Sequence, residues 1–468
     1  MTNSHGSSNF SGLDAYCSRD HHYHDGDRFG RMFPELSPLF TDPRVLDNLG
    51  KPGGVMDGDT QGTVSHTIPV GMTFFGQFVD HDITLDVTSS FDTINSPGDT
   101  PNVRTATLDL DCIYGLGPEA QPYLFHASGA FRGVKLVTGA EVGNGPHTAE
   151  DLPRAGDVAL IGDFRNDENR ILSQMQLAMI RFHNRLCDDL SSNYSGHELY
   201  EEARRKCMWH YQWCVVHDFL ASICGEGVVS RVLSEGRKFY TPKVPFIPVE
   251  FSVAGFRFGH TMVPMKVQTQ QGGNLFELFG TVLGKGFSPV SDARAVTDMH
   301  EMFETHAGRT VQRSGRLDTK LASDLLALPA RVDPEGRSLA TRNMIRGQSF
   351  LLPSGETVAR SLERPDTEID QVSDAARADE PGLQGGTPLW YYILKEAELI
   401  GRENLDGTRL PGEGLGPVGA TIVAETIIGL IELDGRSWLG SNRNWRPDTR
   451  SDDANLELSS IGHIMTYT

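Results

Sequence analysis

Apolar residues recur along this chain at the spacing of helices rather than of strands. Between 169 and 190 they return every three or four positions, which places them on one helical face. The stretch 197–224 has the same periodicity, with acidic residues in its first turns and Gly225 just beyond its end. Further helices are predicted at 249–264, 290–307, 319–328, 388–401 and 417–434.

The remaining stretches predict loops rather than strands. Residues 36–155 are rich in Pro, Gly, Asp and Thr, which indicates loops with short helices. The first 30 residues, rich in Ser, Gly, Asp and His, predict a flexible N-terminal arm. No alternation of strands with helices and no fixed-period repeat is present. The predicted fold class is therefore all-α, mainly helical, with long ordered loops and little β structure.

Charge and composition narrow the range of partners. The 468 residues include 62 acidic and 42 basic side chains, a formal net charge of −20. This charge disfavours nucleic acid and anionic membranes, so we expect a small substrate. No apolar run approaches the roughly 18 residues of a membrane span, and no secretory signal is recognisable. We expect no membrane insertion, and a soluble protein that is cytoplasmic or secreted without a conventional signal. The six cysteines form no C-x-x-C pair, which favours buried thiols over zinc or disulfides.

Two segments combine ionisable residues with apolar neighbours. In "TFFGQFVDHDITLD" (73–86), Asp80, His81 and Asp82 follow one another inside a run that is mostly aromatic and aliphatic. Buried charges need a partner, so the segment is either a surface turn or part of a metal or cofactor site. In "GDFRNDENR" (162–170), Arg165 and Glu168 lie three positions apart and would face the same side of a turn. The alternative is an ordinary helix start with acidic residues.

Three further segments carry candidate chemistry. In "GFRFGHTMVP", His260 follows Gly259 and two aromatic residues, a pattern that also suits a core histidine. In "SLATRNMIRGQSF", Asn343 and Arg346 lie three apart, which a polar loop explains equally well. The segment "TATLDLDCIYG" alternates hydroxyl and carboxylate residues, which an extended chain would direct to one side as oxygen ligands for calcium. Its candidate ligands are Thr105, Thr107, Asp109 and Asp111, with a solvated acidic loop as the alternative.

Taken together, these motifs resemble one family. "FGQFVDHD", "GDFRNDE" followed by "RFHNRL", "FRFGH" and "NMIRG" occur here in the order found in animal-type haem peroxidases. The resemblance runs from "RFGRMFPEL" at 28 to the C-terminal "GLIELDGRSWLGSNRNWRP", nearly the whole chain. The sequence is similar to the bacterial branch of the peroxidase-cyclooxygenase superfamily. The resemblance implies a mainly helical fold that binds haem b.

The resemblance also implies a role for each motif residue. His81 would be the distal histidine that moves a proton between the oxygens of peroxide, with Gln77 holding water or peroxide beside it. Arg165 would stabilise the charge on the departing oxygen. His260 would be the proximal ligand of the haem iron, with Asn343 as the partner of its other ring nitrogen.

Haem attachment follows from the same resemblance. Asp80 and Glu168 match the carboxylates that form ester bonds with haem methyl groups. A further sulfonium link in the family uses a methionine directly after this glutamate, where this chain has Asn169. We therefore expect ester bonds but no sulfonium link. Arg257 and Arg346 are the expected partners of the haem propionates, with ordinary salt bridges as the alternative.

The calcium site is completed by the resemblance. The family's calcium loop lies where this chain has residues 105–111. It is completed by the aspartate after the distal histidine, here Asp82. The ion would brace the distal helix on the side opposite the haem.

The implied activity is that of a haem peroxidase. Such an enzyme uses hydrogen peroxide to oxidise bromide, iodide, thiocyanate or organic one-electron donors through an oxo-ferryl intermediate. Because the implied distal and proximal residues are far apart in sequence, we expect residues 31–468 to form a single catalytic domain. A fatty-acid dioxygenase of the same superfamily is an alternative, but the position of its radical tyrosine is Arg257 here. A non-catalytic adhesion module is the other alternative, disfavoured by the joint presence of His81, Arg165, His260 and Asn343.

Overall fold

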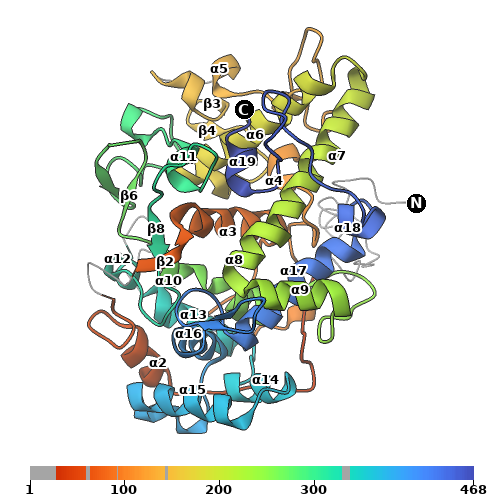
Figure 1. Ribbon diagram of the computed structural model, residues 1–468. Helices are drawn as coiled ribbons and strands as arrows, with labels where there is room; N and C mark the ends of the chain where they lie inside the picture. Colours follow the sequence, from red (N-terminus) through yellow and green to blue (C-terminus); the bar gives the residue numbers. More distant parts are fainter. Residues whose placement is uncertain (1–27, 59–63, 92, 143–145, 329–337) are drawn as a thin grey trace.

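Helices form most of the architecture, and the strands are short pairs between them (Figure 1). The computed structural model describes residues 28–468 except 59–63, 92, 143–145 and 329–337. The longer helices are α2 (Pro43–Gly50), α3 (Val70–Ile83), α6 (Arg170–Leu190), α7 (Gly196–Cys214), α9 (Glu226–Glu235), α13 (Leu339–Ser349), α14 (Gly355–Ser361), α15 (Asp366–Asp379), α16 (Leu389–Leu399) and α17 (Pro417–Leu433). The short ones are α4 (Asp111–Tyr114), α5 (Gly139–Val142), α8 (Ala221–Cys224), α10 (Gly259–Met262), α11 (Met299–Met302), α12 (Ser323–Leu326), α18 (Trp438–Ser441) and α19 (Ile461–Met465). This confirms the mainly helical class.

The strands pair two by two and form no extended sheet within the described residues. One pair is parallel and joins β1 (Phe29–Gly30) to β5 (Ile247–Pro248). The other pairs are antiparallel: β2 (Val64–Pro69) with β8 (Arg313–Gly315), β3 (Arg154–Ala155) with β4 (Val158–Ala159), β6 (Lys266–Gln268) with β7 (Leu275–Glu277), and β9 (Arg402–Glu403) with β10 (Arg409–Leu410).

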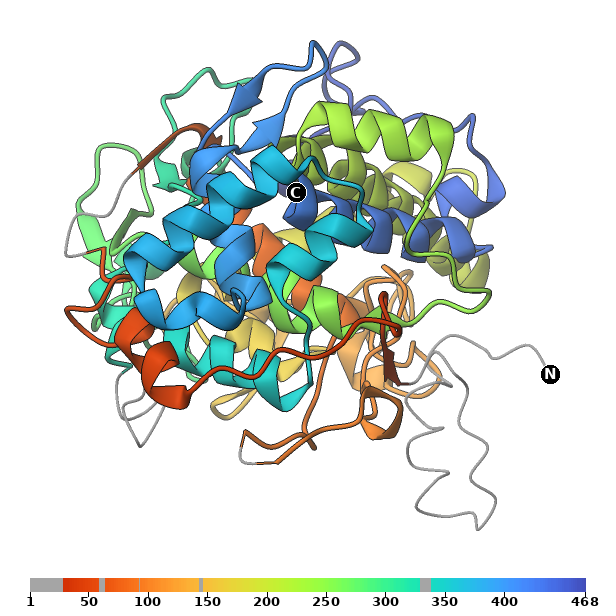
Figure 2. The same cartoon turned by 90° about the horizontal axis from the view of Figure 1, so that it is seen from below.

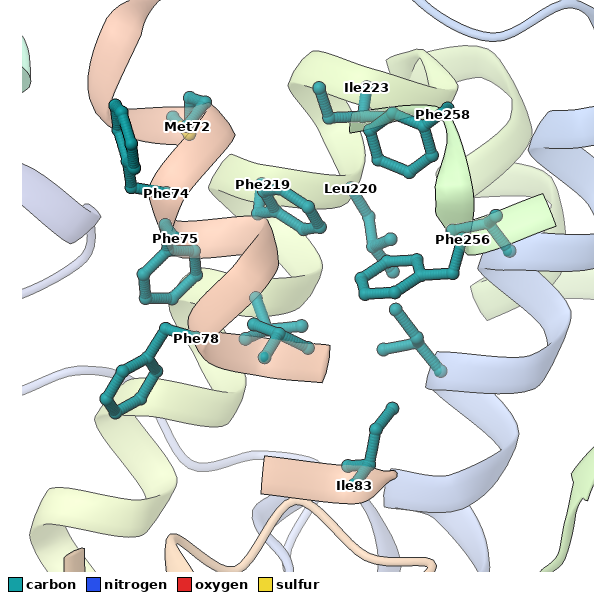
Figure 3. Packing of buried hydrophobic residues seen from close by; sticks show 14 of the residues in the cluster. Met72, Phe74, Phe75, Phe78, Ile83, Phe219, Leu220, Ile223, Phe256 and Phe258 are labelled. Atoms are coloured by element: carbon teal, nitrogen blue, oxygen red, sulfur yellow. The ribbon is translucent and has the colours of Figure 1, made fainter. Parts of the chain in front are cut away.

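Helix α3 lies at the centre of the molecule and is apolar over most of its surface (Figure 1). Figure 3 shows its phenylalanines beside Phe219, which follows α7 in the chain. The ring centroids of Phe75 and Phe219 lie 5.7 Å apart, edge to face. A Cβ atom at Gly76 would lie only 3.1 Å from the Phe219 ring, so glycine permits this close approach. The packing fixes α3 rigidly within the core.

Three of the predicted helices are confirmed closely. The stretch 169–190 is α6, with the Asn169 side chain accepting a hydrogen bond from Leu172 N (2.9 Å) as its N-cap. The stretches 388–401 and 417–434 are α16 and α17. The stretch 197–224 is helical throughout but not uniform, because α7 widens into a π-helical segment, η6 (Val215–Leu220), before α8.

The prediction of one helix at 249–264 was confirmed only in part, because the stretch is helical but changes type along its length. This stretch consists of a π-helical segment, η7 (Glu250–Ala254), a 3₁₀ turn, η8 (Gly255–Arg257), and the short helix α10. The Glu250 carboxylate is buried and accepts hydrogen bonds from the backbone N–H groups of Met32 (2.9 Å) and Phe33 (3.2 Å). At Gly255 a Cβ atom would lie 2.9 Å from Ile422 of α17. These tertiary contacts, which local periodicity does not encode, set the backbone here.

Two other predicted helices were also wrong in extent. In 290–307 only η9 (Ala293–Ala295) and α11 are helical, and in 319–328 only α12. Asp292 and Asp298 each accept a hydrogen bond from the N–H two residues later, and each starts a new short turn. Conversely, the polar segment around Asn343 is a helix, α13, capped by the Ser338 side chain. In Figure 2, α2 lies beside α13, which it contacts.

Other predictions fall partly outside the described residues. The N-terminal arm at 1–30 lies mostly on residues 1–27, which the structure does not describe, whereas Phe29 and Gly30 belong to β1. Five cysteines are free and buried, as predicted, namely Cys112, Cys187, Cys207, Cys214 and Cys224. Among the described residues, no helix combines the length and apolar character that crossing a bilayer requires.

Candidate active site

One cavity of about 1090 Å³ collects most of the residues singled out in the sequence. It is bordered by α3, by the segment around residue 165, by η8 and α10, and by α13. Nine predicted site residues line it together, namely Gln77, Asp80, His81, Arg165, Glu168, Arg257, His260, Asn343 and Arg346. Phenylalanines supply much of the remaining wall, among them Phe74, Phe256, Phe279 and Phe350.

Helix α3 presents a polar stripe to this cavity. Thr73, Gln77, Asp80 and Thr84 recur every three or four positions and all line the cavity, with His81 beside them. The neighbouring residue, Asp82, is fully buried and belongs to a different cluster, described below. Consecutive residues of α3 therefore face two different sites.

His81 is held by a chain of buried amides. Its Nδ1 lies 2.8 Å from Oδ1 of Asn166, and the Asn166 amide donates to Oε1 of Gln176 (2.8 Å). Gln176 in turn donates to the carbonyl of Cys112 (3.0 Å). Because Oδ1 of Asn166 is an acceptor, Nδ1 of His81 carries the proton and Nε2 keeps its lone pair. Burial, reinforced by the Arg165 charge, lowers the pKa of His81 to about 4, so the ring is neutral near pH 7.

Arg165 is fixed in the 3₁₀ turn η5 (Phe164–Asp167). Asp163, the N-cap of this turn, accepts hydrogen bonds from both the backbone and the guanidinium of Arg165, the closest at 2.6 Å. The same guanidinium donates to the carbonyls of Thr84 (2.7 Å) and His81 (3.1 Å). Burial raises the pKa of Asp163, but the hydrogen bonds from Arg165 outweigh it, so the pKa stays below its ordinary value. The cation is thus rigidly placed at the cavity wall.

Two carboxylates face the cavity from different segments. Glu168, just after η5, accepts a hydrogen bond from the Gln77 amide. Burial raises the pKa of Glu168. Asp80 accepts a hydrogen bond from the Thr84 hydroxyl (2.9 Å). Both carboxylates border the same cavity.

His260 lies on α10, which is far from α3 in sequence but lines the same cavity. Nδ2 of Asn343 lies 2.7 Å from its Nδ1. A half-turn of the Asn343 amide would present Oδ1 to a protonated Nδ1 and leave Nε2 free for a metal. Burial and the charge of Arg257 lower the pKa of His260 to about 3, so the ring is neutral.

An arginine cluster borders the same end of the cavity. Arg257 donates from Nε to the carbonyl of Ser252 (2.9 Å), and burial lowers its pKa. Arg346 pairs with Asp86 (2.5 Å), while burial lowers its pKa to about 10. Arg342, which the sequence motifs did not single out, also lines the cavity. This end of the cavity is therefore suited to anionic groups.

A second cluster, the carboxylate cluster, consists of Asp82, Asp109 and Asp111. One carboxylate oxygen from each lies within 4.8 Å of the others, and the three residues are at most 1 % exposed. Among the described residues, Oδ1 of Asp82 and Oδ2 of Asp111 have no hydrogen-bond partner. Buried, unpaired carboxylate oxygens are suited to a hard cation.

The surroundings of this cluster differ in part from the sequence prediction. The hydroxyls of Thr105 and Thr107 each donate to Asp109 at 3.0 Å, so these three side chains lie together. The segment is not extended, however, because it bends repeatedly and Asp111 begins α4. Leu110 adopts a left-handed conformation, with φ of 59°, which turns Asp111 toward its neighbours.

Sequence reasoning missed several polar residues of the site. Asn166 and Asp163 lie within the quoted motif "GDFRNDENR", but their partners His81 and Arg165 identify them only in three dimensions. Arg104 pairs with Asp111 (3.3 Å) and Asp163 (2.9 Å), and so links the carboxylate cluster to the cavity wall. Asp163 could have been recognised as an N-cap, because aspartate is among the residues preferred at that position. No local pattern marks Arg104.

The fold and the cavity define a haem peroxidase-type protein, and comparison with known families agrees. The family model "Animal haem peroxidase" matches residues 87–376, well over half of the chain. The chain therefore belongs to the animal haem peroxidase family. The matched range includes Arg165, His260 and Asn343, whereas His81 lies before it.

Known relatives are considerably longer. Dual oxidase 1 of Caenorhabditis elegans is 27% identical over 252 residues, which cover 50% of this chain and 16% of that protein. Eosinophil peroxidase of Mus musculus is 35% identical over 107 residues, 22% of this chain and 15% of that protein. The chain thus matches about a sixth of the length of these relatives.

Solved structures share the fold at low identity. Peroxidase A of Dictyostelium discoideum superposes with a TM-score of 0.61 and 16% identity, covering 88% of each chain. Fatty acid alpha-dioxygenase of Arabidopsis thaliana gives a TM-score of 0.58 and 14% identity, covering 88% of this chain and 73% of the other. Both likenesses concern the fold alone.

Proposed function

We propose that this chain is a haem-dependent peroxidase, which reduces hydrogen peroxide and oxidises small anions or organic one-electron donors. The observation that carries the proposal is one cavity lined by His81 and, from distant segments, by His260 and Asn343. Membership of the animal haem peroxidase family supports the same reaction class. We treat residues 31–468 as one catalytic domain, because within this range the lining of the cavity extends from Thr73 to Phe350.

The cavity residues fit a haem group. The volume of about 1090 Å³ is at the upper end of ligand pockets, roughly 300–1,000 Å³. Arg257 donates from Nε to the Ser252 carbonyl at 2.9 Å. This acceptor is uncharged, so a haem propionate would give the enclosed cation an anionic partner. His260 would hold the iron through Nε2, and Arg346 would receive the other propionate.

Bound haem would supply the iron at which peroxide is reduced. The chain's own contribution begins with His81, whose neutral ring keeps a lone pair on Nε2 because Nδ1–H donates to Asn166. Nε2 can take the proton from one peroxide oxygen and return it to the other. Arg165, immobilised by Asp163, stabilises the negative charge on the departing oxygen. Gln77 faces the same space and would hold water or peroxide there.

Covalent attachment of haem belongs to the same proposal. Asp80 and Glu168 face the cavity from different segments, and each would hold the haem by an ester bond to a methyl group, for which hydrogen peroxide would be the oxidant. Asn169 also lines the cavity and has no sulfur for a third bond. Haem b would therefore be held by two ester links, as well as by His260.

The carboxylate cluster would bind calcium. Calcium prefers six to eight oxygen ligands, and Asp82, Asp109 and Asp111 offer hard carboxylate oxygens in one buried place. Thr105 and Thr107 stand against Asp109 and would complete the shell. Since Asp82 directly follows His81 on α3, the ion would hold the histidine's helix in position from the side away from the cavity.

The electron donors that enter the space beside His81 would be small anions rather than bulky molecules. The space beside His81, Gln77 and Arg165 is polar and cationic, which suits bromide, iodide and thiocyanate. Without the sulfonium link that Asn169 precludes, chloride would be a poor substrate. Phenols would react at the haem edge by losing one electron at a time.

A donor panel tests this proposal. Purified holoenzyme would be given peroxide with bromide, iodide, thiocyanate, chloride or a phenol, and an unsaturated fatty acid with either peroxide or dioxygen alone. We expect bromination of a dione trap and poor chlorination in matched reactions. Fatty-acid oxygenation with dioxygen, without any halide oxidation, would instead indicate a dioxygenase despite Arg257 at the position of the radical tyrosine.

A further inference from the structure

A tyrosine and a histidine form a completely buried pair behind the active site. The hydroxyl of Tyr114, on α4, lies 3.0 Å from Nδ1 of His183, on α6, and both side chains are fully buried. Nε2 of His183 lies 3.0 Å from the carbonyl oxygen of Val134. A carbonyl only accepts, so Nε2 carries the imidazole proton and Nδ1 accepts the hydrogen bond from the phenol. Burial, together with the neighbouring Cys207 thiol, raises the pKa of Tyr114.

A bonded path joins this pair to the candidate active site. From His81 it runs through Asn166 and Gln176 to the carbonyl of Cys112, with successive contacts of 2.8, 2.8 and 3.0 Å. Tyr114 follows Cys112 by two residues on α4. Every side chain along this path is buried, so the path is densely packed and screened from bulk solvent.

We propose that Tyr114 is a redox-active tyrosine that supplies an electron to the active site and its proton to His183. The inference rests on the proposed peroxidase function, because hydrogen peroxide is the oxidant. Reduction of one peroxide to two waters takes two electrons and two protons. Tyr114 provides one electron, the reducing donor provides the other, and solvent supplies both protons, because the Tyr114 proton stays on His183. In Tyr114 the O–H bond breaks, and a new N–H bond forms at Nδ1 of His183. The neutral phenoxyl radical returns to phenol when a donor electron arrives and His183 gives the proton back.

The surroundings require the electron and the proton to leave together. The Arg204 guanidinium lies 5.3 Å from the centre of the Tyr114 ring, so a cationic ring would be repelled. His183 is neutral, because burial lowers its pKa to about 4, and its Nδ1 is therefore free to accept. The oxidised phenol is a much stronger acid than phenol itself, so even this weak base takes its proton. A buried Tyr114 radical would store an oxidising equivalent away from the haem cavity.

Freeze-quench electron paramagnetic resonance of the holoenzyme tests the assignment. Wild type, Tyr114→Phe and the control Tyr200→Phe would each receive one equivalent of hydrogen peroxide, with the Soret band recorded in parallel. Tyr200 is a suitable control because it is also buried and its ring centroid lies 6.3 Å from those of Tyr114 and His183. We expect a tyrosyl signal in wild type and in Tyr200→Phe, and its loss in Tyr114→Phe with the Soret response retained.

The outcomes separate the inference from the proposed function. A Soret response with no tyrosyl signal, or with one that Tyr114→Phe leaves unchanged, would overturn the inference alone. A Soret band that does not change when peroxide is added would overturn the peroxidase proposal and the inference with it. If Tyr114→Phe does not fold, the same resonance measurement on wild-type protein in D₂O tests the assignment. The radical should then show coupling to an exchangeable deuteron and to ¹⁵N-labelled histidine, and absence of both couplings would refute the Tyr114–His183 pair.

Discussion

Replacing Asp109 by asparagine should change thermal stability in opposite directions with and without calcium. The substitution keeps the size of the side chain and an oxygen that accepts from Thr105, while Nδ2 faces the Thr107 hydroxyl as a donor, and it removes one of three buried charges. With calcium absent, Asp82 and Asp111 then no longer face a third carboxylate. With calcium present, the ion loses a charged ligand.

The structure gives the size of both effects. Two full charges 4.8 Å apart repel by about 3.5 kcal/mol at an effective dielectric of about 20. Burial and the neighbouring carboxylates raise the pKa of Asp82, and burial raises that of Asp111 to about 7, so partial protonation lowers this cost to roughly 1–3 kcal/mol. Calcium at about 1,000 times its Kd stabilises the wild type by about 4 kcal/mol. An unfolding entropy of about 2 cal/mol/K per residue over 468 residues makes 1 kcal/mol roughly 1 °C in Tm.

Differential scanning calorimetry across a calcium titration measures which of the two proteins has the higher Tm at each calcium concentration. In chelator, Asp109→Asn should melt about 1–3 °C above wild type, and at saturating calcium wild type should melt higher. Asp157→Asn, at an exposed aspartate outside the cluster, should follow wild type throughout. A wild-type Tm that ignores both chelator and calcium would refute the cation site. So would an Asp109→Asn protein that is less stable in chelator.

Three further predictions concern the cavity. After turnover with peroxide, acid-acetone should not extract haem from wild type, whereas Asp80→Val and Glu168→Gln should each retain one ester link. Complete extraction of haem from wild type after turnover would exclude both links. The rate of peroxide reaction, followed by stopped flow, should stay level as pH falls through 6.5 and decline only near the pKa of His81, about 4, because the neutral ring is the active form. A decline centred at 6.5 would contradict the buried, neutral assignment. Asn166→Ala should cost about 1–3 kcal/mol in chemical denaturation and slow the peroxide reaction, because it leaves Nδ1–H of His81 unpaired; an unchanged rate would show that Asn166 does not fix the tautomer.

The lowered pKa values of the buried histidines also make the stability of the fold depend on pH, and they fix the direction of that dependence. The unfolded chain protonates His81 and His183 near pH 6.5, whereas both have a pKa of about 4 in the folded protein. Between these values the unfolded state binds more protons, so the stability that the neutral rings contribute is complete above 6.5 and is lost as the pH falls toward 4.

The periodic spacing of apolar residues predicted the regular helices but not the irregular ones. α6, α16 and α17 each bury a helical face in the core, so the pattern of their residues determines them. The π-helical segment at Glu250 depends on hydrogen bonds from Met32 and Phe33, which are more than 200 positions away in sequence. No window of neighbouring residues contains that information.

The site shows a similar division. Motif resemblance selected the nine cavity residues, while elementary chemistry alone left His260 ambiguous between a ligand and a core histidine. Asn166 escaped notice because its partner, His81, lies 85 positions earlier. Arg104 was missed for the same reason, since its link from Asp111 to Asp163 exists only in the folded chain. Long-range polar contacts are where the sequence was least informative.

The absorption spectrum of the haem-loaded protein, with and without peroxide, tests the central claim most directly. Wild type should show a Soret band that shifts on adding peroxide. His81→Ala should keep the band and lose its rapid response, typically by a factor of about 10²–10⁴. His260→Ala should lose haem or show an altered band, because it removes the proposed iron ligand. A wild-type protein that takes up no haem, or a His260→Ala spectrum identical to that of wild type, would contradict the assignment of this cavity as a haem site between His81 and His260.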